Sequence, residues 1–100
     1  MKALIEGISY EIEKYSFYIF KLENNLGTLE SRLDLTLNKD KYFPIIEQLT
    51  IDINKYFKGN ISIITSENDK EAFSGYEFMS IDTNSVNNSE IVLHFKKELN

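Results

Sequence analysis

The sequence predicts a single α+β domain with a long N-terminal helix, a second helix and a small antiparallel sheet of two to three strands. Three observations lead to this fold class. Apolar residues alternate at four- and three-residue spacing from Met1 to Leu33, as in a coiled coil. The same spacing returns over residues 41–58, and beyond residue 60 the apolar period becomes two, as in strands. One hundred residues suffice for one core, so we expect residues 1–100 to form one domain.

The N-terminal stretch can be interpreted in two ways. Its middle, "YSFYIFKL", is aromatic and β-branched like a buried strand, whereas the four-three spacing continues through it and through both flanks. Because the heptad pattern accounts for the longer segment, we expect a coiled-coil-like helix over 1–36. A break near 24–28 is the alternative, since Asn24, Asn25 and Gly27 are poor helix formers.

This helix also predicts self-association. It would be roughly 50 Å long, and a second helix half that length could not cover its apolar seam. We therefore expect a homo-oligomer, with the alternative that the seam packs within its own chain. Tyr10, Phe17 and Phe20 fall on the opposite side of the helix, which gives its first half two apolar faces. The seam residues are Ile5, Ile8, Ile12, Tyr15, Ile19, Leu22, Leu26, Leu29 and Leu33.

The rest of the chain is expected to hold the second helix and the strands. A helix over 41–58 accepts Pro44 in its first turn and ends before Gly59. Strands are expected over 60–65 and 76–82, joined by "SENDKEAFSG" as a long polar loop, and 83–89 is rich in turn residues. Residues 90–99 fit a strand or a helix, and we favour the strand.

Composition narrows the class of partner. The net charge of −5 argues against direct binding to nucleic acid, which depends on basic residues. Charged residues interrupt residues 1–23, so we expect no membrane segment. The chain has no cysteine, which excludes disulfides and thiolate chemistry and favours a reducing, cytoplasmic compartment.

No pattern of catalytic residues stands out. The single histidine, His94, lies within the apolar run "IVLHF", where a packing role is the commoner one. The acidic stretch at 67–71 lacks the glycine and closing glutamate of a calcium-binding loop. We therefore expect no enzyme activity, no metal site and no cofactor.

The sequence favours a non-enzymatic protein-binding module, comparable in size and charge to small acidic inhibitors, immunity proteins or antitoxins that mask a larger, basic partner. The alternative is a homo-oligomeric coiled-coil structural or assembly protein. An exposed acidic loop with neighbouring aromatic residues is the candidate partner-binding site. In the competing interpretation, Phe73, Tyr76 and Phe78 close over the sheet as core. The candidate binding residues are Glu67, Asp69, Glu71, Tyr76 and Glu77.

Overall fold

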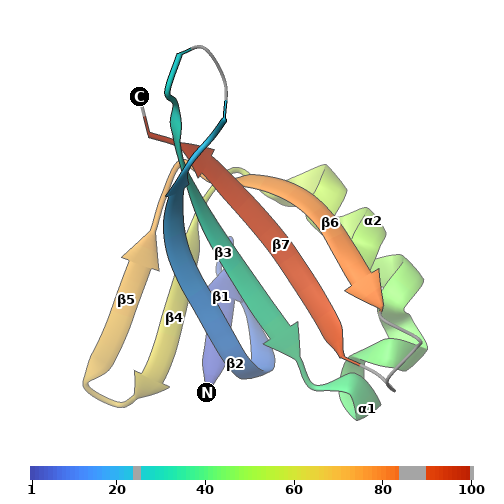
Figure 1. Cartoon of the computed structure of the whole chain (residues 1–100). Helices are drawn as coiled ribbons and strands as arrows, with labels where there is room; N and C mark the ends of the chain where they lie inside the picture. The colour runs from blue at the N-terminus through green and yellow to red at the C-terminus, as the bar shows by residue number, and fades with distance from the viewer. Residues whose placement is uncertain (24–25, 84–89, 100) are drawn as a thin grey trace.

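A computed structural model describes residues 1–23, 26–83 and 90–99. Within these residues the chain forms one sheet of seven strands with a helical segment on one side (Figure 1). Every strand pair is antiparallel, and the spatial order is β5-β4-β1-β2-β3-β7-β6. The strands are β1 (Lys2–Ile5), β2 (Ile8–Lys21), β3 (Leu29–Leu37), β4 (Ile61–Ser66), β5 (Asp69–Phe73), β6 (Glu77–Thr83) and β7 (Ile91–Glu98).

The predicted N-terminal helix is wrong, and with it the coiled coil and the small sheet of two to three strands. The first third of the chain forms β1, β2 and β3. The predicted break near 24–28 falls in the turn between β2 and β3, where the Leu22 N–H donates to the Thr28 carbonyl at 2.8 Å. Residues 24–25 of that turn lie outside the described part of the chain.

Two interruptions explain why strands imitated a heptad repeat. Residues seven apart on an unbroken strand point to opposite faces, because the side-chain period is two. A two-residue turn at Glu6–Gly7, both with positive φ, separates Ile5 from Ile12. A bulge between Ile12 and Lys14 then shifts the alternation again. The turn places Ile5 and Ile12 on the same face, where both are buried, and the bulge places Ile19 on that face as well.

The core lies between the sheet and the helical segment. We call the sheet surface that faces this segment the inner face and the opposite surface the outer face. Leu33, Leu35, Leu93 and Phe95 lie side by side on the inner face of β3 and β7 and are fully buried. Phe57, just after the helical segment, packs its ring on Phe95 with the centroids 5.0 Å apart. The apolar period of two in β3 and β7 therefore supplies most of the central core.

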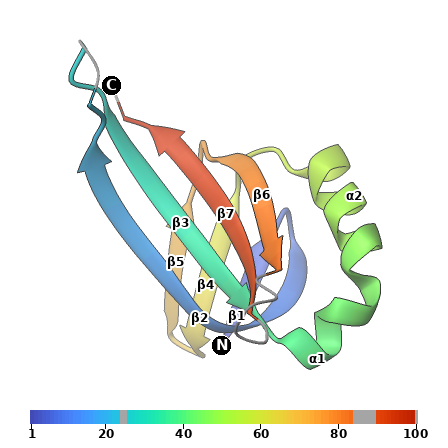
Figure 2. The same ribbon diagram turned by 45° about the vertical axis from the view of Figure 1, so that its right-hand side comes forward.

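The helical segment occupies 39–56, where the sequence predicted a helix over 41–58. It consists of α1 (Lys39–Tyr42), the 3₁₀ turn η1 (Phe43–Ile45) and α2 (Ile46–Tyr56). The Asn38 side chain caps α1 by accepting a hydrogen bond from the Lys41 N–H at 2.9 Å. Leu49 and Ile53 of α2 point to the sheet and are buried, and Figure 2 shows the helix alongside the inner face.

The C-terminal part contains more strands than expected. Residues 66–75, expected as a loop, hold the turn between β4 and β5 and then β5 itself, with Ser66 opposite Asp69. β4 and β6 coincide closely with the strands expected at 60–65 and 76–82, and residues 91–98 form β7 in the middle of the sheet. The turn expected at 83–89 lies almost wholly outside the described residues.

Candidate protein-binding site

The hairpin of β2 and β3 extends past the rest of the sheet. We call residues 13–22 and 26–31 the arm, and the remaining sheet together with α2 the base. Figure 1 shows the end of this hairpin rising above the other strands. Large apolar side chains are exposed along it: 45% of Phe17, 53% of Ile19 and 86% of Leu26 is accessible to solvent. The arm therefore gathers exposed apolar residues in one projecting element.

One edge of the arm has no neighbouring strand. β1 pairs with β2 only as far as Lys2 opposite Glu11, with a last bond from the Ile12 N–H to the Met1 carbonyl. Over residues 13–21, no described residue pairs with the side of β2 that faces away from β3. We call this side the free edge.

The register determines which backbone groups point outward from the free edge. Leu22 and Thr28 form a hydrogen-bonded pair, so alternate residues of β2 direct their N–H and C=O groups to β3. The N–H and C=O groups of the intervening residues point away from β3. These outward-pointing residues are Tyr15, Phe17, Ile19 and Lys21.

The inner face of the arm closes over the strand β5. The Phe17 ring packs against the Phe73 ring, with the centroids 5.4 Å apart. The Tyr15 hydroxyl donates to a Glu71 carboxylate oxygen at 3.2 Å. Desolvation and the Glu71 carboxylate raise the pKa of Tyr15 above its usual value, which keeps the phenol a hydrogen-bond donor further into alkaline pH.

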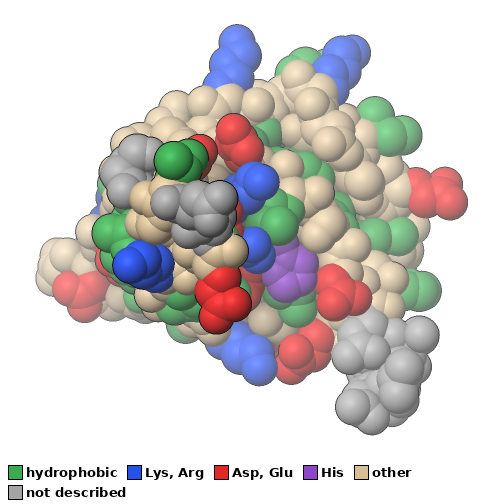
Figure 3. All heavy atoms as spheres, turned by 45° about the horizontal axis from the view of Figure 1, so that its top comes forward, with side chains coloured by type: hydrophobic (Ala, Val, Ile, Leu, Met, Phe, Trp, Pro, Cys, Tyr) green, Lys and Arg blue, Asp and Glu red, His purple; other side chains and the backbone are tan. Residues whose placement is uncertain are grey.

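The outer face of the arm carries aromatic and charged side chains. The Tyr18 and Phe20 rings stack with centroids 6.0 Å apart, and the Arg32 guanidinium lies over Phe20. Asp34 accepts hydrogen bonds from the Tyr18 hydroxyl at 3.3 Å and pairs with His94 Nδ1 at 2.7 Å. Figure 3 shows the histidine among acidic and basic side chains on this surface. Burial and the Asp34 carboxylate raise the pKa of Tyr18.

These groups do not form a catalytic set. The Asp34–His94 pair lies on an open sheet surface. Among the described residues, the only other side chain hydrogen-bonded to this pair is Tyr18. The raised pKa of Tyr18 keeps its phenol protonated, so it is a poor nucleophile. The described residues contain no group of three histidine, cysteine, aspartate or glutamate side chains that could hold a metal ion.

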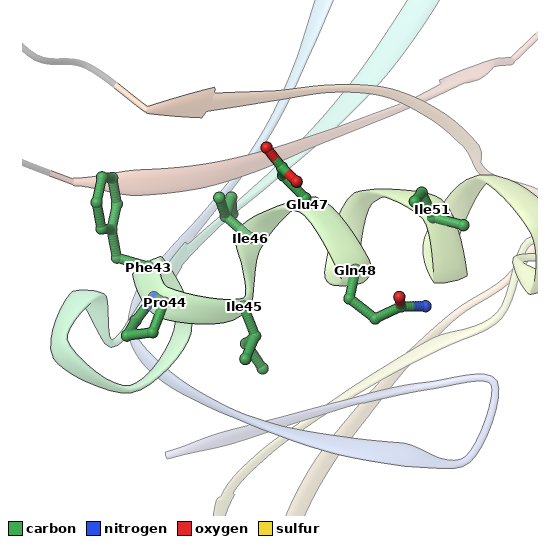
Figure 4. Close-up of a pocket in the computed structure, with 7 residues that line it drawn as sticks. All are labelled: Phe43, Pro44, Ile45, Ile46, Glu47, Gln48 and Ile51. Carbon is green, nitrogen blue, oxygen red and sulfur yellow. The ribbon is translucent and has the colours of Figure 1, made fainter.

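A separate groove of about 440 Å³ lies at the start of α2 (Figure 4). Glu47 is its one ionisable side chain, which leaves no second group for proton transfer. Phe43, Ile45 and Ile51 line the groove and are each about half exposed. The groove is therefore a mixed surface feature beside the helix, where Glu47 and Gln48 lie next to these apolar side chains.

The structure disperses the predicted self-association seam. Ile5, Ile12 and Leu33 are buried in the base, whereas Ile8 is exposed beside the Glu6–Gly7 turn. The remaining members come together on the arm, although on a strand hairpin and not along a helix. These arm members are Tyr15, Ile19, Leu22, Leu26 and Leu29.

The predicted acidic site is divided by the structure. Glu67 lies exposed in the β4–β5 turn, Asp69 accepts a hydrogen bond from the Ser66 hydroxyl at 3.0 Å, and Glu71 reaches Tyr15. Tyr76 is buried, with its hydroxyl hydrogen-bonded to that of Ser31, as the core interpretation of this segment expected. Glu77 is exposed at the start of β6, away from the other carboxylates.

Sequence reasoning missed the free edge itself. The sequence feature that indicates this edge is the uncharged aromatic run at 15–20, which lies between Lys14 and Lys21. Apolar residues on both faces of a strand are expected where both faces are covered or where the strand meets a partner. A helical interpretation places the same aromatic residues on two sides of a helix, and a helix has no backbone edge open to a partner strand.

No helix among the described residues is long and apolar enough to cross a bilayer. No protein-family model, no curated protein and no solved structure matches this chain.

Proposed function

We propose that the protein is a non-enzymatic protein-binding module that captures an extended segment of a partner by strand addition along the free edge. The observation that carries this proposal is the outward row of N–H and C=O groups on residues 15–21. A strand added to an open edge gains main-chain hydrogen bonds, and its side chains contact those on both faces of the sheet.

The two outermost strands of the sheet, β5 and β6, differ from this edge because they carry features that prevent pairing. β5 carries charged residues at three of its five positions, Asp69, Lys70 and Glu71, and β6 has a bulge between Phe78 and Ser80. Charges and bulges are the devices by which proteins keep sheet edges from pairing. Residues 15–20 of the free edge contain neither, which supports its use as a binding surface.

The surroundings favour a basic segment as the ligand. Asp69 and Glu71, with Lys70 between them, help to line a groove of about 220 Å³ beside Tyr15, at the lower end of the free edge. A strand entering there with lysine or arginine would meet these carboxylates, and the net charge of −5 would speed the encounter. Binding of a basic segment fits an inhibitor-like role, in which a small acidic protein masks a basic site on a larger partner. The lack of cysteine supports a reducing, cytoplasmic setting.

A capture experiment from native host cells tests the proposal, with mass spectrometry to identify bound proteins. The key variant is Ile19→Pro, because the Ile19 N–H points away from β3 and its removal leaves the β2–β3 ladder intact. Ile19→Val is the matched control, since it keeps the N–H. We expect the control to retain the partner and the proline variant to lose it.

Equal capture by both variants would place binding elsewhere and refute strand addition. Once a partner is known, reversing Glu67, Asp69 and Glu71 to lysine should slow association, most strongly at low salt. An association rate and salt dependence that do not change would remove the acidic segment from the site.

A further inference from the structure

We infer that the free edge binds the same edge of a second copy of this chain, so that the two sheets join as a symmetric antiparallel dimer. The inference rests on the proposed function, because it assigns an occupant to the same edge. A heterologous segment would then compete with the second copy for it.

The free edge begins where the pairing of β1 with β2 ends. β1 occupies the adjacent row of the sheet up to Met1, which pairs with Ile12. A partner's β2 entering this row antiparallel would pair along residues 13–21, and its hairpin turn, which begins at Leu22, would bend away from Met1. Using both free edges in full places Phe17 opposite its own equivalent, on the two-fold axis of the dimer.

Charge complementarity selects the same register. Glu13, in the bulge at the base of the free edge, accepts a hydrogen bond from the Asn38 side chain at 2.9 Å, and Lys21 lies at the tip. Antiparallel pairing brings each Glu13 carboxylate near the partner copy's Lys21, twice by symmetry. The tip would also approach the groove lined by Asp69, Lys70 and Glu71, whose two carboxylates outnumber its one ammonium group. A parallel arrangement would place like charges together at both ends of the edge.

The side chains are self-complementary between these ends. On one side of the joined sheet, Phe17 meets Phe17 of the second copy and Tyr15 meets Ile19. On the other side, Lys14 meets Phe20, where its ammonium can contact the aromatic ring, and Ser16 meets Tyr18. Contacts between aromatic or β-branched residues on neighbouring strands are among the stabilising pairs of antiparallel sheets.

Closure distinguishes this pairing from aggregation. A two-fold interface uses the free edge of each chain once and leaves no copy of it open. The edges that remain at the outside of the joined sheet are β5 and β6, which carry the protective charges and bulge. The expected product is therefore a discrete dimer.

Sedimentation equilibrium of the full chain at low to high micromolar concentration tests the inference. We expect about twice the 11.7 kDa chain mass for the wild type and for Ile19→Val, and a single chain mass for Ile19→Pro. Circular dichroism checks that the proline variant is folded. A wild-type monomer throughout, or an oligomer that Ile19→Pro leaves intact, would overturn the inference.

Spin labels provide a second test that does not need the proline variant. The chain has no cysteine, so Phe17→Cys and Lys21→Cys each give a single labelling site. In the proposed register the two labels at position 17 lie closest, whereas the strand positions at 21 are separated by about 27 Å along the strand. Equal distances at both positions would indicate parallel pairing and would contradict the register.

The two proposals fail in distinguishable ways. A monomeric wild type that captures a partner through the free edge would remove the dimer and keep the binding module. A dimer lost in Ile19→Pro with no captured protein would keep the dimer and remove the heterologous partner.

Discussion

The base and the arm share the same two strands, β2 and β3, but bury similar side chains to very different extents. Leu33 is fully buried, whereas Phe17, directly opposite it on β2, is 45% exposed. β7 continues the sheet beside Leu33, whereas the row beside Phe17 is empty of described residues. The difference shows that burial here depends on neighbouring strands and on α2, and not on residue type alone.

The largest difference in stability between the base and the arm is expected from replacing one phenylalanine of each with alanine. Phe95→Ala removes a fully buried ring that touches both Phe57 and Phe78, and should lower the free energy of unfolding by about 3–5 kcal/mol. Phe17→Ala removes a half-exposed ring and should cost about 1–2 kcal/mol. Urea unfolding at low protein concentration measures both changes, and equal losses would show that the arm is part of the same packed core.

The next largest loss of stability is expected from a pair of hydroxyl groups where the arm meets the base. Ser31 of the arm and Tyr76 beneath it are buried and hydrogen-bonded to each other. Tyr76→Phe leaves the Ser31 hydroxyl without this partner, so we expect a loss of about 1–3 kcal/mol, with a similar loss for Ser31→Ala.

The double variant Ser31→Ala with Tyr76→Phe supplies the control. It should lose less stability than the two single variants added together, because no unpaired hydroxyl remains. Strict additivity in urea unfolding would mean that the bond does not connect the arm to the base.

The smallest effect concerns the base alone and depends on pH. The Glu6 carboxylate accepts hydrogen bonds from the Asn60 and Lys58 N–H groups, both at 2.9 Å, and these lower its pKa below the ordinary 4.5. Its contribution to stability is therefore complete above pH 4.5 and is lost as the pH falls through the lowered pKa.

Glu6→Gln should remove this contribution. The difference in urea midpoint between wild type and variant should be largest near neutral pH and shrink in acid. A difference that stays constant from pH 7 to below the lowered pKa would show that the ionised carboxylate is not responsible.

The sequence predicted the later elements better than the first third of the fold. The helix at 39–56 has a clear cap, an early proline and apolar residues on one face, so its signals agree with each other. In the first third, Ile5, Ile12 and Ile19 are seven residues apart and still lie on one face of the sheet, because a turn and a bulge interrupt the strands. A bulge leaves no residue signature here, so a periodicity count could not detect it.

The candidate site was harder to predict because its main feature is a backbone edge. The sequence predicts self-association through Ile19 and Leu29, which are exposed, but it places them on a helical seam whose other members lie elsewhere in the fold. The sequence allows Tyr76 to be either a binding residue or part of the core, and the structure buries it, hydrogen-bonded to Ser31. The order of strands in a sheet depends on tertiary pairing. The alternation of apolar and polar residues within one strand does not reveal it.

The strand order has a consequence for synthesis of the chain on the ribosome. β7, the last strand described, lies between β3 and β6, so the inner sheet cannot be completed until residues 91–98 have emerged. At about 5–20 residues per second, translation from the end of β3 to the end of β7 takes roughly 3–12 s. For that interval the nascent β1–β2–β3 meander has open strands on both of its sides, and neighbouring nascent chains on one messenger could meet there before either is finished.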